Sequence, residues 1–140
     1  MMVRVFFACL LLAAPASALE PMTGEEFRAF TDGYTLYVED ETGAHFGADQ
    51  FPGDNRSIWL PSEGDCLHGV WAQVDDRICF LYEDGRPACW LIYRDGETSL
   101  RFESAPALEE EDYGATDALP PLFLTKRDKR PLICPEGPGV

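Results

Sequence analysis

The sequence predicts an all-β fold, an antiparallel meander of about eight strands that closes into a small barrel and is preceded by one short N-terminal helix. Short apolar and aromatic runs recur from residue 34 onward at nearly even spacing, and Gly, Pro, Asn or Asp separates them. Strands punctuated in this way are typical of up-and-down β architectures. Two cysteines at matching positions of a predicted hairpin, Cys79 and Cys89, favour the same arrangement.

Residues 1–18 predict a secretory signal peptide. Arg4 supplies the positive start, residues 5–14 the apolar run, and Ala16-Ser17-Ala18 the cleavage site. The run is shorter than the roughly 20 residues that a membrane-spanning helix needs. Cys9 lies in its middle, whereas a lipid anchor needs a cysteine at its end. We therefore expect residues 19–140 to form a single β domain, periplasmic or secreted, without a membrane anchor.

The predicted helix lies within residues 22–33. Thr23 and Glu26 have the spacing of a capping box, Phe27 and Phe30 form an apolar edge, and Gly33 stops the helix. Eight strands are predicted after it, and Asp95-Gly96 is interpreted as a two-residue hairpin turn. The strands are expected at residues 34–39, 44–51, 56–60, 67–74, 77–83, 88–94, 97–103 and 121–126.

The central strands are apolar on both faces. With hairpins around Asp75-Asp76 and Asp84-Gly85, one face carries Trp71, Ile78, Phe80, Tyr82, Trp90 and Ile92. The other face carries Val70, Ala72, Val74, Cys79, Leu81, Cys89, Leu91 and Tyr93. One face must line the interior. We expect the chain itself, through the helix or the segment at Cys134, to cover the other face, with a ligand or a partner as the alternative.

Removal of the signal leaves four cysteines, which predict two disulfides in an oxidising compartment. The predicted registers place Cys79 directly opposite Cys89, at bridging distance. Cys66 lies roughly 20 Å from either of them at about 3.3 Å per residue. We therefore predict Cys79–Cys89 and Cys66–Cys134 disulfides.

Cysteine could instead ligate a metal. Zinc held by Cys66, His68, Cys79 and Cys89 is the alternative, but the same registers scatter these four ligands. A redox pair normally has two residues between its cysteines and a helix beside them, and both features are missing here. We expect no metal and no other cofactor.

The chain is strongly acidic, with a formal net charge of −14, and loss of Arg4 with the signal makes it one unit more negative. Such a surface repels nucleic acid and attracts cationic partners, although it can also serve solubility alone. Residues 105–117 are expected to form an acidic surface loop. Its candidate contacts with a cationic partner are Glu109, Glu110, Glu111 and Asp112.

No catalytic residue is predicted. General acid–base chemistry needs a carboxyl group whose pKa is raised by burial, but nearly all the acidic residues are expected in turns or in the acidic loop. His45 and His68 lie on separate predicted strands, and no Ser or unpaired Cys has a nucleophile motif. Loops for phosphate or for hand-type calcium sites are not found either.

The pattern of Trp59, GDC at 64–66, GVW at 69–71, ICFLYED at 78–84, ACW at 88–90 and PLIC at 131–134 resembles a known family. It is similar to small exported proteobacterial proteins described as a domain of unknown function, over about residues 33–140. This resemblance implies no catalytic residue. The helix followed by a meander is also similar in architecture to lipocalin-like barrels, including small periplasmic inhibitors of lysozymes and proteases.

Three hypotheses of function follow. The first is a non-catalytic exported binding module that acts like an inhibitor on a cationic protein. The second is a barrel that holds a small apolar ligand against Trp71, Phe80 and Trp90. The third is an enzyme of unknown activity, for which a His68→Ala variant would have to lose a measurable activity.

Overall fold

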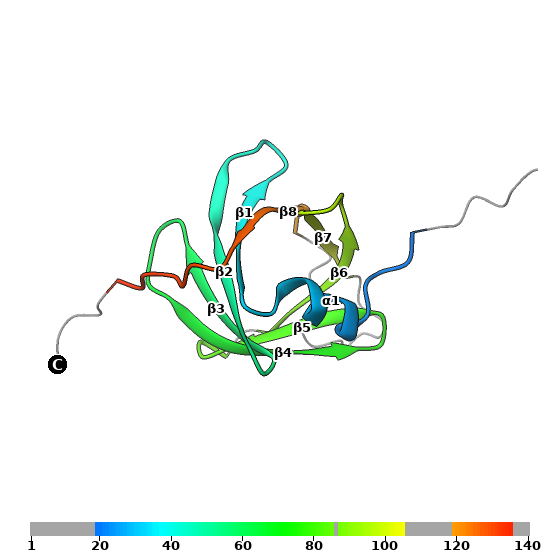
Figure 1. The fold of residues 1–140 in the computed structure, drawn as a ribbon, viewed down its shortest axis with the longest axis horizontal. Helices are drawn as coiled ribbons and strands as arrows, with labels where there is room; N and C mark the ends of the chain where they lie inside the picture. Colours follow the sequence, from blue (N-terminus) through cyan, green and yellow to red (C-terminus); the bar gives the residue numbers. More distant parts are fainter. Residues whose placement is uncertain (1–18, 86, 106–118, 136–140) are drawn as a thin grey trace, which may run out of the picture.

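The computed structural model describes residues 19–85, 87–105 and 119–135, which form one helix and one closed antiparallel barrel (Figure 1). Each strand pairs with the next one in sequence, and β1 also pairs with β8. This confirms the predicted all-β barrel of eight strands with one short N-terminal helix. The elements are α1 (Gly24–Thr31), β1 (Tyr34–Asp40), β2 (His45–Gly53), β3 (Arg56–Pro61), β4 (Leu67–Val74), β5 (Arg77–Tyr82), β6 (Pro87–Arg94), β7 (Leu100–Ser104) and β8 (Leu122–Asp128).

The predicted registers of the central hairpins are confirmed. Ala72 lies opposite Cys79, and Cys79 lies opposite Cys89. The face that carries Phe80 and Ile92 is therefore the interior, and both side chains are buried there. Two-residue turns follow Val74 and Gly53, as the turn chemistry of the sequence requires.

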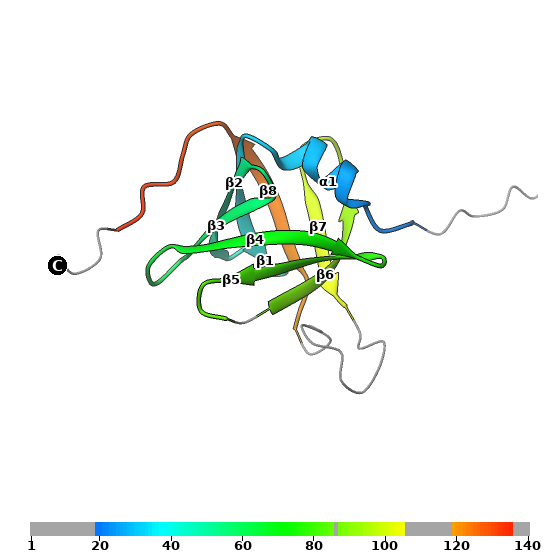
Figure 2. The ribbon, with the colours of Figure 1, turned by 90° about the horizontal axis from the view of Figure 1, so that it is seen from below.

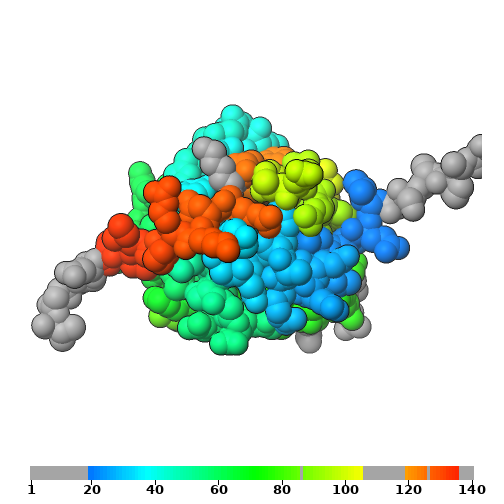
Figure 3. All heavy atoms as spheres, viewed as in Figure 1, coloured from blue at the N-terminus to red at the C-terminus, as the bar shows by residue number. Residues whose placement is uncertain are grey.

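Helix α1 closes one end of the barrel, which we call the helix end (Figures 1 and 2). It begins at the predicted capping box, in which Thr23 and Glu26 each bond the other's backbone N–H. Phe27 points from the helix into the barrel, where it is fully buried and packs edge-on against Phe51 and Trp71 at centroid distances of 5.3 and 4.9 Å. Figure 3 shows α1 filling the middle of this face.

Arg127 of β8 holds the C-terminal part of helix α1. Its guanidinium donates a 2.9 Å hydrogen bond to the carbonyl of Phe30 and lies 4.2 Å from the centroid of the Phe30 ring. At the start of the helix, the backbone N–H of Gly24 donates to the side-chain oxygen of Gln73 on β4. The helix is thus held to both sides of the barrel wall.

Both predicted disulfides are present. Cys79 and Cys89 join neighbouring strands with Cα atoms 4.0 Å apart. Cys66 and Cys134, 5.5 Å apart at Cα, join the β3–β4 turn to the segment after β8. That segment is also bonded to β2 through the backbone N–H of Leu132 and the side chain of Gln50. Such disulfides are typical of an oxidising environment outside the cytoplasm.

Two sequence predictions need correction. The connection at Asp95 is a longer loop, because Arg94 pairs with Leu100 and the N–H of Asp95 bonds the carbonyl of Ser99, so β7 starts later than predicted. The outer face of β4 and β5 is not covered by the described chain, since α1 and the Cys134 segment pack elsewhere. Val70, Val74 and Leu81 remain about half exposed there.

Some predictions lie outside the described residues. These are the signal peptide, residues 1–18, and the acidic contacts Glu109, Glu110, Glu111 and Asp112. Within the described chain, no helix has the length and apolar character needed to cross a membrane.

The two disulfides should differ in their contribution to stability. Their cysteines are 68 and 10 residues apart, and a disulfide that closes a longer loop removes more entropy from the unfolded chain. We expect a Cys66→Ala/Cys134→Ala variant to lose about 4 kcal/mol of unfolding free energy and a Cys79→Ala/Cys89→Ala variant about 3 kcal/mol, measured by urea denaturation. Equal stability of the first variant and the unmodified protein would contradict the role of Cys134 as an anchor.

Candidate functional site

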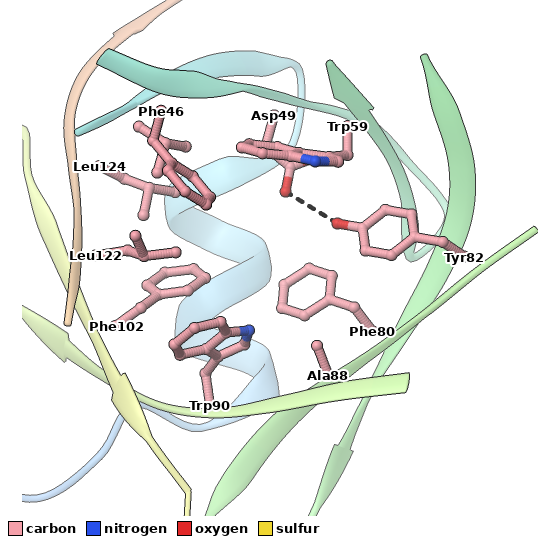
Figure 4. Close-up of a pocket in the computed structure, with 11 residues that line it drawn as sticks. Phe46, Asp49, Trp59, Phe80, Tyr82, Ala88, Trp90, Phe102, Leu122 and Leu124 are labelled. Atoms are coloured by element: carbon pink, nitrogen blue, oxygen red, sulfur yellow. Dashed lines mark hydrogen bonds between the residues drawn. The ribbon is translucent and has the colours of Figure 1, made fainter. Parts of the chain in front are cut away.

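The barrel contains a cavity of about 170 Å³ at the end opposite α1, which we call the far end (Figure 4). The turns β1–β2, β3–β4 and β5–β6 lie at this end, because the strands alternate in direction. The side chains around it converge from seven of the strands. They are Val38, Phe46, Asp49, Trp59, Phe80, Tyr82, Ala88, Trp90, Phe102, Leu122 and Leu124.

The cavity runs from a partly exposed rim to a buried floor. Phe46 at the rim is 46% exposed, and Trp59 beside it is partly buried, with ring centroids 5.8 Å apart. Phe80 and Trp90 on the floor are almost fully buried, and each packs on Phe102. A ligand could therefore enter from the solvent side and reach an apolar aromatic interior.

Asp49 of β2 is the one charged side chain among the described residues of the cavity wall, and it is only 5% exposed. Its Oδ1 atom accepts a 2.6 Å hydrogen bond from the hydroxyl of Ser57 on β3. Its Oδ2 atom accepts a longer bond, 3.3 Å, from the hydroxyl of Tyr82 on β5 (Figure 4). The Ser57 and Tyr82 hydroxyls are themselves 3.1 Å apart, so the three groups form one small network.

Burial dominates the electrostatics of this network. It raises the pKa of the Asp49 carboxyl to about 7, against the opposing effect of the hydrogen bonds from Ser57 and Tyr82. Burial, followed by the charge of Asp49, raises the pKa of the Tyr82 hydroxyl well above its ordinary value. Tyr82 therefore stays neutral near pH 7, whereas Asp49 changes its charge there.

Two glycines make room for the aromatic wall. Gly69 lies between Ser57 and Tyr82 in the strand pairing, and a Cβ atom there would meet Cδ1 of Tyr82 and the carbonyl oxygen of Leu81, both at 2.7 Å. The missing side chain lets the Tyr82 ring lie across β4 and reach Ser57 and Asp49. Gly47 leaves the corresponding space for the ring of Trp59.

The structure brings together two of the three predicted aromatic contacts. Phe80 and Trp90 line the cavity. Trp71 lies toward the helix end, where it packs on Phe27 and under the guanidinium of Arg28. His45 and His68 are exposed at the surface and are not among the lining residues.

Asp49, which lies within the strand predicted at residues 44–51, was not identified from the sequence. The alternation of side chains between the two faces of β2 indicates that Asp49 points inward. Phe51 faces the interior, and Asp49 is two residues away, so both share the inner face of β2. Asp49 is thus an exception to the expectation that nearly all the acidic residues lie in turns or in the acidic loop.

Among residues 19–85, 87–105 and 119–135, no group of three or more His, Cys, Asp or Glu side chains could hold a metal ion. Comparison with family models, with curated proteins and with solved structures finds no match to this chain. The function must therefore be argued from the cavity itself.

The charge of Asp49 should destabilise the fold at alkaline pH. Because its pKa is about 7 in the folded state against an ordinary 3.8, the folded protein keeps a proton that the unfolded chain releases between these values. Stability is thus lost as the pH rises through this range, by on the order of 4 kcal/mol. An Asp49→Asn variant keeps the shape without the charge. We expect its melting temperature to be several degrees above that of the unmodified protein at pH 8, and the two melting temperatures to be nearly equal at pH 4.

Exposed Glu41, in the β1–β2 turn, provides the control for net charge. Calorimetry of a Glu41→Gln variant should show no comparable rise in melting temperature at pH 8. A stability difference between Asp49→Asn and the unmodified protein that is the same at pH 4 and pH 8 would show that Asp49 does not change its charge in this range.

Proposed function

We propose that this protein is an exported, non-catalytic binding module whose barrel holds a small apolar ligand at the far end. The observation that supports this most directly is the cavity between Phe80, Trp90 and Phe102, which has a partly exposed rim and an apolar floor. Small-ligand sites are typically concave and apolar, with few polar groups that fix orientation. Asp49 and Tyr82 are the polar groups of this wall.

The size of the cavity limits the ligand. A cavity of about 150 Å³ accommodates a benzene molecule, and this one measures about 170 Å³. The expected ligand is therefore a single ring or a short branched chain. Export, to the periplasm or the medium, is part of the proposal and draws support from the predicted signal, the two disulfides and the resemblance to small exported proteobacterial proteins.

A cavity-filling variant tests the proposal. Ala88 lies on the wall between Phe80 and Trp90, so Ala88→Leu places three more carbon atoms in the cavity. We expect benzyl alcohol to bind the unmodified protein and to bind Ala88→Leu at least tenfold more weakly, as measured by chemical-shift titration in NMR. The melting temperature should stay equal or rise, because filling a void adds contacts.

Ala72→Leu is the matched control, because Ala72 is exposed on the outer face of strand β4. It should bind benzyl alcohol as the unmodified protein does. Equal binding by Ala88→Leu and Ala72→Leu would show that the probe does not occupy the cavity.

A second candidate function, binding of a cationic protein, is favoured by the charge at the far end. The β1–β2 and β3–β4 turns contain no Lys or Arg, and Arg86 is the one basic residue in the sequence of the β5–β6 turn. The acidic residues there, including adjoining strand ends, are Glu39, Asp40, Glu41, Glu63, Asp65, Glu83 and Asp84. A field of this sign steers cationic proteins toward this end of the barrel.

Charge-matched variants test this candidate. Glu63→Gln/Asp65→Asn removes two charges at the far end, and Glu25→Gln/Asp76→Asn removes two at the helix end. We expect the first variant to associate severalfold more slowly with an immobilised basic lysozyme at 50 mM salt, and the second to associate nearly as fast as the unmodified protein. At 300 mM salt the difference should vanish. If both variants associate equally slowly, the effect depends on net charge alone and not on the charge at the far end.

A further inference from the structure

Asp49 is a buried acid for which the described chain supplies no cation. Its two hydrogen bonds come from the neutral hydroxyls of Ser57 and Tyr82, and the second is long at 3.3 Å. No Lys, Arg or His is found among the described residues that line the cavity. A carboxylate can accept about four hydrogen bonds, so this one keeps acceptor capacity. Burial of an unpaired charge is costly, which makes a charge partner from outside the chain favourable.

The walls next to Asp49 are aromatic. Trp59 is its direct neighbour on β3, and Tyr82 reaches it from β5. Phe46 lies at the rim against Trp59, and Phe80 lies below Tyr82 with the two rings nearly parallel. Faces of aromatic rings attract cations, most strongly where water is excluded. A carboxylate with aromatic rings beside it is thus a suitable site for an organic cation.

The acidic turns of the far end add a long-range contribution. They lie at the same end of the barrel as the cavity and would raise the local concentration of cations there. Basic side chains such as Arg28, Arg94 and Arg127 instead lie against aromatic rings at the helix end. The charge distribution of the described residues therefore favours cations at the end where the cavity opens.

We propose that the ligand of the cavity is a small organic cation, an ammonium group attached to one ring or to a short alkyl body. This inference rests on the proposed binding function and specifies its ligand class. The ammonium group lies at Asp49 between Trp59 and Tyr82, where it donates to the carboxylate. The apolar body lies on Phe80, Trp90 and the neighbouring floor of the cavity.

Binding should depend on pH in a defined direction. The cation binds the ionised form of Asp49, whose pKa is about 7 in the free protein. Affinity should thus rise with pH up to about 8 and fall as Asp49 takes up a proton. The described side chains around Asp49 are Leu36 and Val38 on β1 and Ser57 and Trp59 on β3, with Phe80 and Tyr82 of β5 across the interior. Tyr82 is the titratable group among them, and it remains neutral here.

A pair of probes of equal shape tests the inference. Benzylamine is cationic at pH 8, whereas benzyl alcohol is neutral and of nearly the same size. We expect the unmodified protein to bind benzylamine at least tenfold more tightly than benzyl alcohol at pH 8, as measured by calorimetric titration. The preference should shrink at pH 5.5. Asp49→Asn should lose the preference for the amine, so that its affinities for the two probes become similar.

Glu41→Gln is the control that removes one exposed charge of the β1–β2 turn and leaves the cavity intact, and it should change benzylamine binding by less than twofold. Equal affinity of the unmodified protein for both probes, or a preference that survives in Asp49→Asn, overturns the cation inference and leaves the proposed cavity function standing. Failure of both probes to bind overturns the proposed function as well, and the inference with it.

Discussion

The limited width of an eight-stranded barrel is the constraint on which the rest of this structure depends. Such a barrel is just wide enough to be filled by its own side chains or to hold one small ligand. At the helix end the interior is filled, because Phe27 of α1 occupies the space between Phe51 and Trp71. At the other end the described strands leave a cavity between their aromatic side chains.

The polar part of the cavity wall is the hydrogen-bond network around Asp49, and it is assembled from several strands. Asp49, Ser57 and Tyr82 come from β2, β3 and β5, and β4 lies between the last two. The network can cross β4 only because position 69 is glycine. Gly69 and Tyr82 thus form a cross-strand pair in which a missing side chain positions an aromatic one. Function here would depend on a residue that contacts no ligand.

Local patterns in the sequence predicted much of the fold. The capping box at Thr23, the turn at Asp75-Asp76 and the facing positions of Cys79 and Cys89 each depend on residues close together in the chain. The pairing of Cys66 with Cys134 followed by elimination. Position 95 was misread because an Asp-Gly pair also fits a longer loop, and the choice depends on the pairing of Arg94 with Leu100.

The site was harder to predict than the fold, for a physical reason. The burial of Asp49 depends on closure of the barrel around β2, whereas the local sequence from His45 to Gln50 is polar or small except for Phe46. Nothing within a few residues distinguishes it from an acid at the surface. Likewise, Trp71 and Trp90 share a face in the sequence pattern. Only the position of α1 shows that Trp71 packs against the helix whereas Trp90 lines the cavity.

Closure of the sheet between β1 and β8 has a consequence for how the chain folds. The partner of Leu36 is Arg127, so the first strand cannot complete its hydrogen bonds until the last strand has emerged. Contacts between such distant segments are slow to form. A chain exported from its N-terminus would therefore carry an unpaired β1 edge throughout transit, and the barrel, with its cavity, would come into existence only after translocation has finished.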